Sequence, residues 1–140
     1  MTTIFADVKS GVMVCDSKCS DENTWYPVTK VRRVGDELVG YAGSMKNCQA
    51  WLKWYMSGKR GTRPKTESFQ ALSLRSTGIY EHSSDGAEIL IERGFHGVGS
   101  GGSLAVAAFM AGAKPKQAVD IALLIDTGSG GEVHTHKLVK

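Results

Sequence analysis

Strand-like segments occur in two runs along this 140-residue chain, four before the first helix-like segment and three after it. Two helix-like segments and a final strand-like segment follow the second run. Parallel sheets are built from strands and helices that alternate along the chain, whereas this order keeps the two kinds of element apart. The pattern therefore predicts an α+β fold with antiparallel sheets.

The expected boundaries come from hydrophobic periodicity and from turn residues. Strands are expected at residues 2–8, 11–15, 28–34, 37–42, 69–76, 78–82, 89–93 and 130–139. Helices are expected at residues 44–56, 103–110 and 113–124, the first because its apolar residues recur every three or four positions. The basic segment 57–68 and the glycine run 97–102 are expected to be loops.

Composition limits the classes of protein to consider. The length fits one domain, residues 1–140, and 41% apolar residues with 22% charged residues exclude a disordered or fibrous chain. A net charge of +3 gives no reason to expect nucleic acid as a partner. No apolar run approaches the ~18 residues of a membrane span, and the start lacks signal-peptide features, so we expect a cytoplasmic protein without membrane contact.

Three cysteines and two nearby histidines raise the question of a zinc site. Cys15 and Cys19 are separated by three residues, and His134 and His136 by one. Zinc sites usually contain tighter pairs such as C-x-x-C. The odd number of cysteines, with Cys48 as the third, fits a reducing compartment. We therefore interpret the cysteines as incidental or buried thiols.

Two further motifs invite a functional interpretation that their context does not support. Residues 97–102 match G-x-G-x-x-G, but the acidic residue about 20 positions later, Asp120, falls inside a predicted helix rather than at a strand end. Residues 126–129 spell Asp-Thr-Gly-Ser, as in aspartic proteases, but only 11 residues follow them. A second β-rich lobe, which such a protease needs around its catalytic Asp, has no room.

A more demanding pattern runs through nearly the whole chain. Its parts are Met1-Thr2-Thr3, Asp16 after a strand, Val28-x-Lys30-Val31-Arg32-Arg33, Gly40-Tyr41-Ala42-Gly43-Ser44 before a helix, Gly99-Ser100-Gly101-Gly102 before a second helix, and Asp126-x-x-Ser129-Gly130-Gly131. In this order the set resembles the proteasome β-subunit and HslV family of N-terminal nucleophile hydrolases. The resemblance implies a four-layer αββα sandwich of two antiparallel sheets covered by helices. It also implies a threonine peptidase.

The chemistry of that family explains why these residue types are needed. Removal of Met1 would free the α-amine of Thr2, and because an α-amine titrates near ~7.7–8.0 it can accept the proton of the Thr2 hydroxyl. Lys30 would favour the neutral amine, and Asp16 would orient Lys30. The N–H of Gly43 would stabilise the oxyanion. By resemblance, Ser100, Asp126 and Ser129 complete the polar surroundings of the amine.

The resemblance also implies a substrate pocket and a cation. Cys19, Val28, Tyr41 and Met45 occupy positions like those of the specificity pocket, and their character suggests cleavage after apolar side chains. No cofactor is expected to be required. A structural Na⁺ or Mg²⁺ ion would be held by the backbone carbonyls of Leu123, Asp126 and Ser129.

Each part of the pattern also has an ordinary structural explanation. An N-terminal Met-Thr is common, Lys30 lies in a Lys-x-Arg-Arg segment typical of a solvated face, Asp16 can begin a turn, and Gly43 can be a helix-entry glycine. Ser129-Gly130-Gly131 can be an ordinary loop after a helix. The joint occurrence in one order is what favours the hydrolase.

The expected assembly is a homo-oligomeric ring that encloses the sites, degrades unfolded polypeptides and works with an AAA+ ATPase. The basic segment 57–68 stands where relatives usually carry a second helix, which bears on the ring and on ATPase docking. Two alternatives remain open. One is a catalytically silent assembly subunit that retains Met1, and the other is an amidase that applies the same Thr2 chemistry to small molecules.

Overall fold

The computed structural model describes residues 1–138 of the chain. Its strands are β1 Ile4–Asp7, β2 Val12–Cys15, β3 Lys18–Ser20, β4 Trp25–Pro27, β5 Val31–Val34, β6 Glu37–Gly43, β7 Phe69–Arg75, β8 Gly78–Ser83, β9 Glu88–Ile91, β10 Phe95–Val98 and β11 His134–Lys137. Its helices are α1 Met45–Met56, α2 Gly102–Met110 and α3 Pro115–Ile125. Among the described residues, none of these helices combines the length and the apolar character that crossing a membrane requires.

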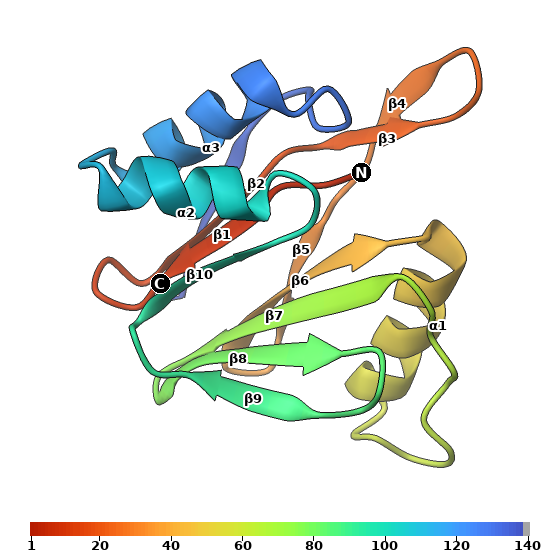
Figure 1. Ribbon diagram of the computed structural model, residues 1–140. Coiled ribbons are helices and arrows are strands. Elements are labelled where there is room, and N and C mark those ends of the chain that lie inside the picture. The colour runs from red at the N-terminus through yellow and green to blue at the C-terminus, as the bar shows by residue number, and fades with distance from the viewer. Residues whose placement is uncertain (139–140) are drawn as a thin grey trace.

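Two antiparallel sheets form the centre of the molecule (Figure 1). One has four strands in the order β10-β1-β2-β11, and the other has five in the order β5-β6-β7-β8-β9. The strands β3 and β4 form a separate hairpin that extends from the first sheet (Figure 1). The chain enters at β1, so its start lies at one end of the inner strands of the four-stranded sheet.

Alternation along β1 explains how this sheet separates two parts of the core. Ile4 and Ala6 belong to the apolar cluster that joins the two sheets. Phe5, between them in sequence, belongs to a second cluster with residues of α2 and α3, as expected because successive side chains of a strand point to opposite faces. All three side chains are fully buried.

The helices cover the outer faces of the two sheets (Figure 1). Helices α2 and α3 pack on the four-stranded sheet through small residues such as Ala105, Ala118 and Ala122. Helix α1 packs on the five-stranded sheet through Trp51 and Tyr55. Ser44 caps α1, since its hydroxyl accepts a hydrogen bond from the backbone N–H of Asn47.

The expected mixture of antiparallel sheets and three helices is confirmed, whereas the description as a four-layer sandwich stays a prediction. Several expected boundaries are wrong by up to three residues, as at β5, which begins at Val31 and not at position 28, and three differences are larger. The strand β10 lies partly within the segment expected to be a glycine loop, the hairpin β3–β4 was not expected, and β11 begins four residues later than position 130. The last residue of that expected strand, 139, lies outside the described residues.

Candidate active site

Thr2 and Thr3 lie directly before β1 and are buried, with 6% and 0% of their surface exposed. Neighbouring backbone holds both residues in place. The N–H of Gly101 donates to the carbonyl of Thr2 at 3.1 Å, and the N–H of Asp16 donates to the carbonyl of Thr3 at 3.1 Å. The start of the chain is therefore fixed between the end of β2 and the beginning of α2.

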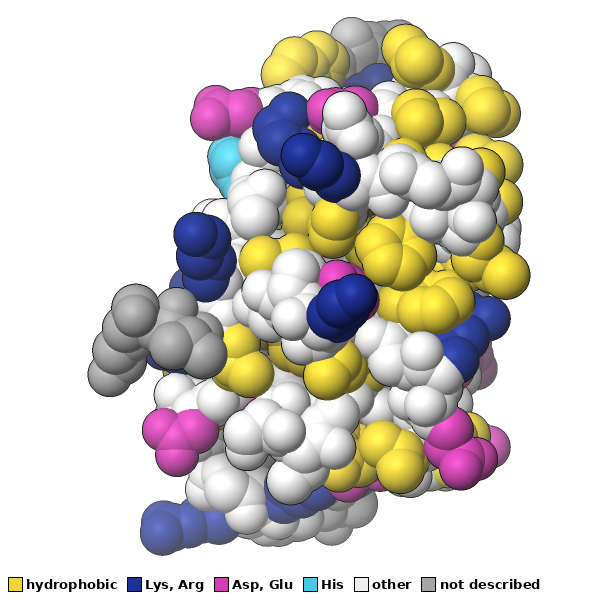
Figure 2. Space-filling model, turned by 90° about the vertical axis from the view of Figure 1, so that its left-hand side faces the viewer, with side chains coloured by type: hydrophobic (Ala, Val, Ile, Leu, Met, Phe, Trp, Pro, Cys, Tyr) yellow, Lys and Arg dark blue, Asp and Glu magenta, His cyan; other side chains and the backbone are white. Residues whose placement is uncertain are grey.

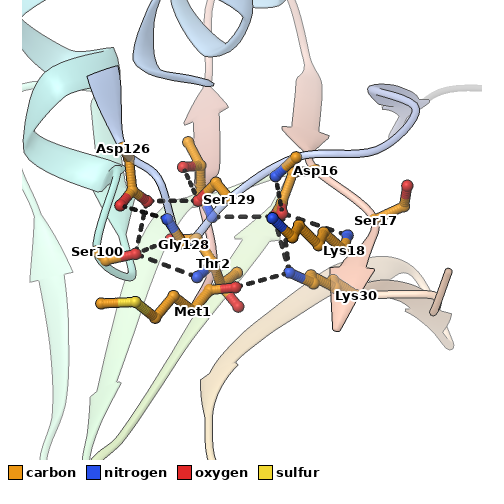
Figure 3. Close-up of polar contacts among 12 residues, drawn as sticks. Met1, Thr2, Asp16, Ser17, Lys18, Lys30, Ser100, Asp126, Gly128 and Ser129 are labelled. Carbon is orange, nitrogen blue, oxygen red and sulfur yellow. Dashed lines mark hydrogen bonds and ion pairs between the residues drawn. The ribbon is translucent and has the colours of Figure 1, made fainter. Parts of the chain in front are cut away.

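A buried ion pair lies on one side of Thr2 (Figure 3). The ammonium group of Lys30, just before β5, lies 2.9 Å and 3.0 Å from the two carboxylate oxygens of Asp16. Backbone N–H groups of Thr3, Lys18 and Gly130 also donate to this carboxylate, at 3.0, 3.3 and 3.0 Å. These bonds satisfy a carboxylate that is completely buried, as a stable buried charge requires.

A chain of hydroxyl and carboxylate groups lies on the other side (Figure 3). Ser100 donates to Asp126 at 2.6 Å and accepts from the backbone N–H of Thr2 at 3.3 Å. Ser129 donates to the same Asp126 oxygen at 2.5 Å. Although partial burial acts to raise the pKa of Asp126, hydrogen bonds from Ser100, Ser129 and the N–H of Gly128 bring this pKa below its usual value. Asp126 therefore stays ionised and fixes both hydroxyls.

Gly43 is the last residue of β6, and it places the end of a strand of the five-stranded sheet beside Thr2. It borders Thr2 in two adjacent pockets. Its φ of +129° is rarely adopted by residues with a side chain, and a Cβ atom there would overlap the backbone carbonyl of Ser68. Only glycine fits this junction between β6 and α1.

A pocket of about 60 Å³ opens beside Thr2 and brings together the four residues expected to bind substrate. These residues are Cys19, Val28, Tyr41 and Met45. Cys48 also lines the pocket, but burial raises the pKa of its thiol to about 11. This thiol is therefore protonated near neutral pH and is a poor nucleophile compared with a thiolate.

Met1 covers the site, and 71% of its surface is exposed. Its carbonyl accepts a hydrogen bond from Lys30 at 3.0 Å, and its side chain lies over Gly128. It also borders both pockets beside Thr2. As long as Met1 is attached, the nitrogen of Thr2 belongs to a peptide bond and cannot act as a base.

No protein-family model and no curated protein sequence matches the chain. Solved structures do match it. Eukaryotic HslV from Trypanosoma brucei superposes with a TM-score of 0.74 at 21% identity, covering 96% of this chain and 98% of the HslV chain. The chain has the HslV fold.

The protein BPH of Thiobacillus denitrificans is similar in the same way. Its structure in complex with epoxomicin gives a TM-score of 0.72 at 17% identity and covers 99% of this chain and all of the BPH chain. A second BPH structure gives 0.68 at 17% identity, with 98% and 97% covered. At these identities the likeness shows the fold alone.

Within this HslV fold, all seven residues expected to be catalytic surround the start of the chain. Thr3 stands in the sequence pattern but was assigned no role, although its hydroxyl lies 2.7 Å from that of Ser129 and so ties β1 to the loop after α3. Gly101 was likewise assigned no role, although a Cβ atom there would overlap the Thr3 hydroxyl. The adjacency of Thr3 to Thr2 and the glycine run were the available signals.

The expected cation stays a prediction. Of its three expected carbonyl ligands, that of Asp126 accepts a hydrogen bond from the N–H of Ser129 at 3.2 Å. One ligand is thus already engaged within the loop.

Proposed function

We propose that the chain is a threonine peptidase of the N-terminal nucleophile type, with Thr2 as its nucleophile after removal of Met1. One observation carries the proposal. The Met1–Thr2 peptide bond is held between two polar groups, with the Met1 carbonyl 3.0 Å from Lys30 and the Thr2 nitrogen 3.3 Å from Ser100 (Figure 3). Cleavage of this bond would leave an α-amine beside Ser100 and a free donor on Lys30.

The reaction follows from these positions. The α-amine accepts the proton of the Thr2 hydroxyl while the oxygen attacks the substrate carbonyl carbon. The proton then passes to the leaving amine as the peptide bond breaks, and an ester on Thr2 remains. Water hydrolyses this ester with the amine again acting as base, which returns Thr2 to its initial state.

Lys30 and Gly43 would stabilise charge during these steps. The Lys30 ammonium disfavours protonation of a nearby amine and stabilises a negative oxygen on Thr2. The N–H of Gly43 would donate to the tetrahedral oxyanion, a contribution of ~10²–10³ in rate in comparable sites. Asp16 keeps Lys30 in place and acts as a positioning residue.

The pocket lined by Val28, Tyr41 and Met45 supports an apolar side chain on the substrate at the cleaved bond. An unfolded polypeptide supplies such side chains in extended, accessible form. We therefore retain unfolded polypeptides as the substrate class, with small-molecule amides as the alternative. Cleavage of small amides without cleavage of unfolded casein would favour the alternative.

A second candidate function is a catalytically silent assembly subunit. The observation that favours it is the Met1 carbonyl, which already satisfies Lys30 and covers the site. If Met1 is retained in the cell, Thr2 has no free amine and the protein contributes only its fold and interfaces.

We further propose a homo-oligomeric ring. Figure 2 shows hydrophobic side chains gathered on the upper part of one face, the level at which Figure 1 places α2 and α3. The exposed apolar residues of these helices are Met110, Ile121, Leu124 and Ile125. A second copy of the chain would cover them. An AAA+ ATPase partner and a cytoplasmic location stay predictions.

The test combines intact mass with peptide hydrolysis. Mass spectrometry of the protein isolated from cells should show loss of one methionine. Thr2→Ala should lower peptide hydrolysis by at least ~10³-fold, and Lys30→Ala should also abolish it. Thr77→Ala, a change of an exposed threonine in the turn between β7 and β8, is the matched control and should leave the rate unchanged.

Epoxomicin gives an independent measurement. It is bound in the BPH structure, and on our proposal it should bind this chain at Thr2. Protection by epoxomicin against thermal unfolding should therefore occur in the wild type and be absent in Thr2→Ala. Equal hydrolysis by wild type and Thr2→Ala would overturn the peptidase, and retained Met1 without activity would support the silent subunit.

A further inference from the structure

Cys15, His134 and His136 lie together on a part of the four-stranded sheet that the proposed reaction does not use. Cys15 is the last residue of β2, and the antiparallel register places His134 directly opposite it on β11. His136 lies two positions further along β11 and therefore on the same face. The ligand atoms of the three side chains all lie within 4.8 Å of one another.

We propose that these three residues form a binding site for a divalent transition-metal ion of the Zn²⁺ type. A thiolate and two imidazoles are ligands that such ions prefer over carboxylate or carbonyl oxygens. Zn–S and Zn–N distances of ~2.3 and ~2.0–2.1 Å imply ligand atoms roughly 3.3–3.7 Å apart in a tetrahedral site. The separations in the structure, all within 4.8 Å, exceed these values by little more than 1 Å, and water would take the fourth position.

An unsatisfied buried nitrogen supports the site independently. The Nε2 atom of His136 is buried, and among the described residues it has no hydrogen-bond partner. Buried polar atoms without partners are uncommon, and a missing ion is one explanation for them.

The surroundings determine how an ion would enter and what it would displace. Strand β11 is an edge strand and His134 is partly exposed, so the ion has a path from solvent. Cys15 is fully buried, and a metal ion binds its sulfur in the thiolate form. The thiol proton must therefore leave to solvent as the sulfur–metal bond forms.

Some charged groups around the site favour the binding of a cation, and others oppose it. Glu132 lies 3.9 Å from His134 and attracts a cation, whereas the guanidinium of Arg33, bound to the backbone carbonyls of residues 137 and 138, opposes it. The Lys30–Asp16 pair beside Cys15 is neutral as a unit. Binding would join β11 to β2 through side chains in addition to their backbone hydrogen bonds.

The experiment uses the full chain, stripped of metal with a chelator and titrated with Zn²⁺ and Co²⁺. The wild type should bind one ion per chain in calorimetry, and Co²⁺ should give a thiolate charge-transfer absorption band. His134→Gln should weaken Zn²⁺ binding by more than the ~10–100-fold that loss of an outer-shell group costs. Cys15→Ser should remove the absorption band.

Cys19→Ala is the matched control, because Cys19 is paired with Cys15 in the sequence but lies on β3 outside the cluster. It should leave Zn²⁺ affinity and the Co²⁺ band unchanged. Since His134 is partly exposed, His134→Gln is expected to fold. If Cys15→Ser does not fold, the Zn²⁺ affinity of His134→Gln still tests the site. Absence of wild-type binding, or binding that His134→Gln leaves intact, would overturn the site.

Discussion

At the scale of single residues, the two members of the Lys30–Asp16 pair differ in how they are held. Asp16 accepts three backbone N–H bonds besides those from Lys30, whereas Lys30 has only Asp16 and the Met1 carbonyl as hydrogen-bond acceptors among the described residues. Loss of Asp16 would therefore leave a buried cation without a counter-charge. Loss of Lys30 would leave a carboxylate that is still hydrogen-bonded.

This difference predicts unequal effects on stability. Asp16→Asn should lower the free energy of unfolding by ~3–5 kcal/mol, the usual effect of removing one partner of a buried pair. Lys30→Met should lower it by less, while both variants should lose peptide hydrolysis. Urea unfolding followed by circular dichroism measures the comparison. A larger loss for Lys30→Met would show that the backbone donors do not support the carboxylate as we argue.

Alanine substitutions at Gly43 and at Gly112 separate the energetic cost of a positive φ from the cost of steric overlap. Gly112 also has a positive φ, of +115°, but a Cβ atom there would meet no heavy atom within 4 Å. Gly112→Ala should thus carry the strain alone, about 1–3 kcal/mol, whereas Gly43→Ala adds overlap with the Ser68 backbone and should cost more. Unfolding of the two variants in urea measures the difference, and equal losses would contradict the overlap.

The ordered motifs predicted which residues gather at the site, but not the bonds among them. Thr2, Asp16, Lys30, Ser100, Asp126 and Ser129 were all expected there and do lie there; their catalytic roles stay predictions. The hydrogen bond between Thr3 and Ser129 joins residues 126 positions apart, which spacing cannot show. The approach of Cys15 to His134 likewise depends on the register between β2 and β11, which the sequence pattern leaves undetermined.

At the scale of elements, periodicity predicted the long segments and missed the short ones. Helix α1 was expected at 44–56 and is found at Met45–Met56, because its buried Cys48, Trp51 and Tyr55 follow helical spacing. Strand β10 was missed because Phe95–Val98 runs into glycines that signal a loop. The hairpin β3–β4 has three residues in each strand, too few for alternation to be recognised.

The packing of α1 on the five-stranded sheet predicts a loss of stability in mild acid. His82 of β8 lies against Trp51 and Tyr55 and is bound to Ser73 at 2.7 Å. Burial is the main cause that lowers its pKa to about 4, although Glu88 opposes the shift. Below about pH 6.5, His82 therefore binds a proton in the unfolded chain, whereas in the folded chain it binds one only below about pH 4.

The contribution of His82 to the free energy of unfolding is fully present above pH 6.5. It decreases as the pH falls, by at most ~1.4 kcal/mol per pH unit. Between pH 7 and pH 5 the wild type should lose about 2 kcal/mol more than His82→Gln. Urea unfolding of both proteins at several pH values measures this difference. Parallel pH profiles would show that His82 does not remain neutral in the folded protein.

At the scale of the whole molecule, the candidate site depends on both sheets. Thr2 precedes a strand of the four-stranded sheet, while Lys30 directly precedes β5 and Gly43 ends β6 in the five-stranded sheet. The sheets approach closely at Gly40, where a Cβ atom would contact Ile4 and Met13. The site is therefore assembled by the packing of the sheets, and local sequence alone does not fix its geometry.

The exposed apolar residues of α3 predict how assembly responds to a single charge. Leu124 has 85% of its surface exposed, and Ile125 beside it has 61%, which is costly unless another copy covers them. On the ring proposal, Leu124→Glu should bury an unpaired charge at the contact and shift the protein to smaller species in sedimentation velocity. Because Leu124 lies outside the core, the variant should keep the wild-type secondary structure in circular dichroism. Met56→Glu, at the end of α1, is the matched control, and equal sedimentation of all three proteins would place the ring contact elsewhere.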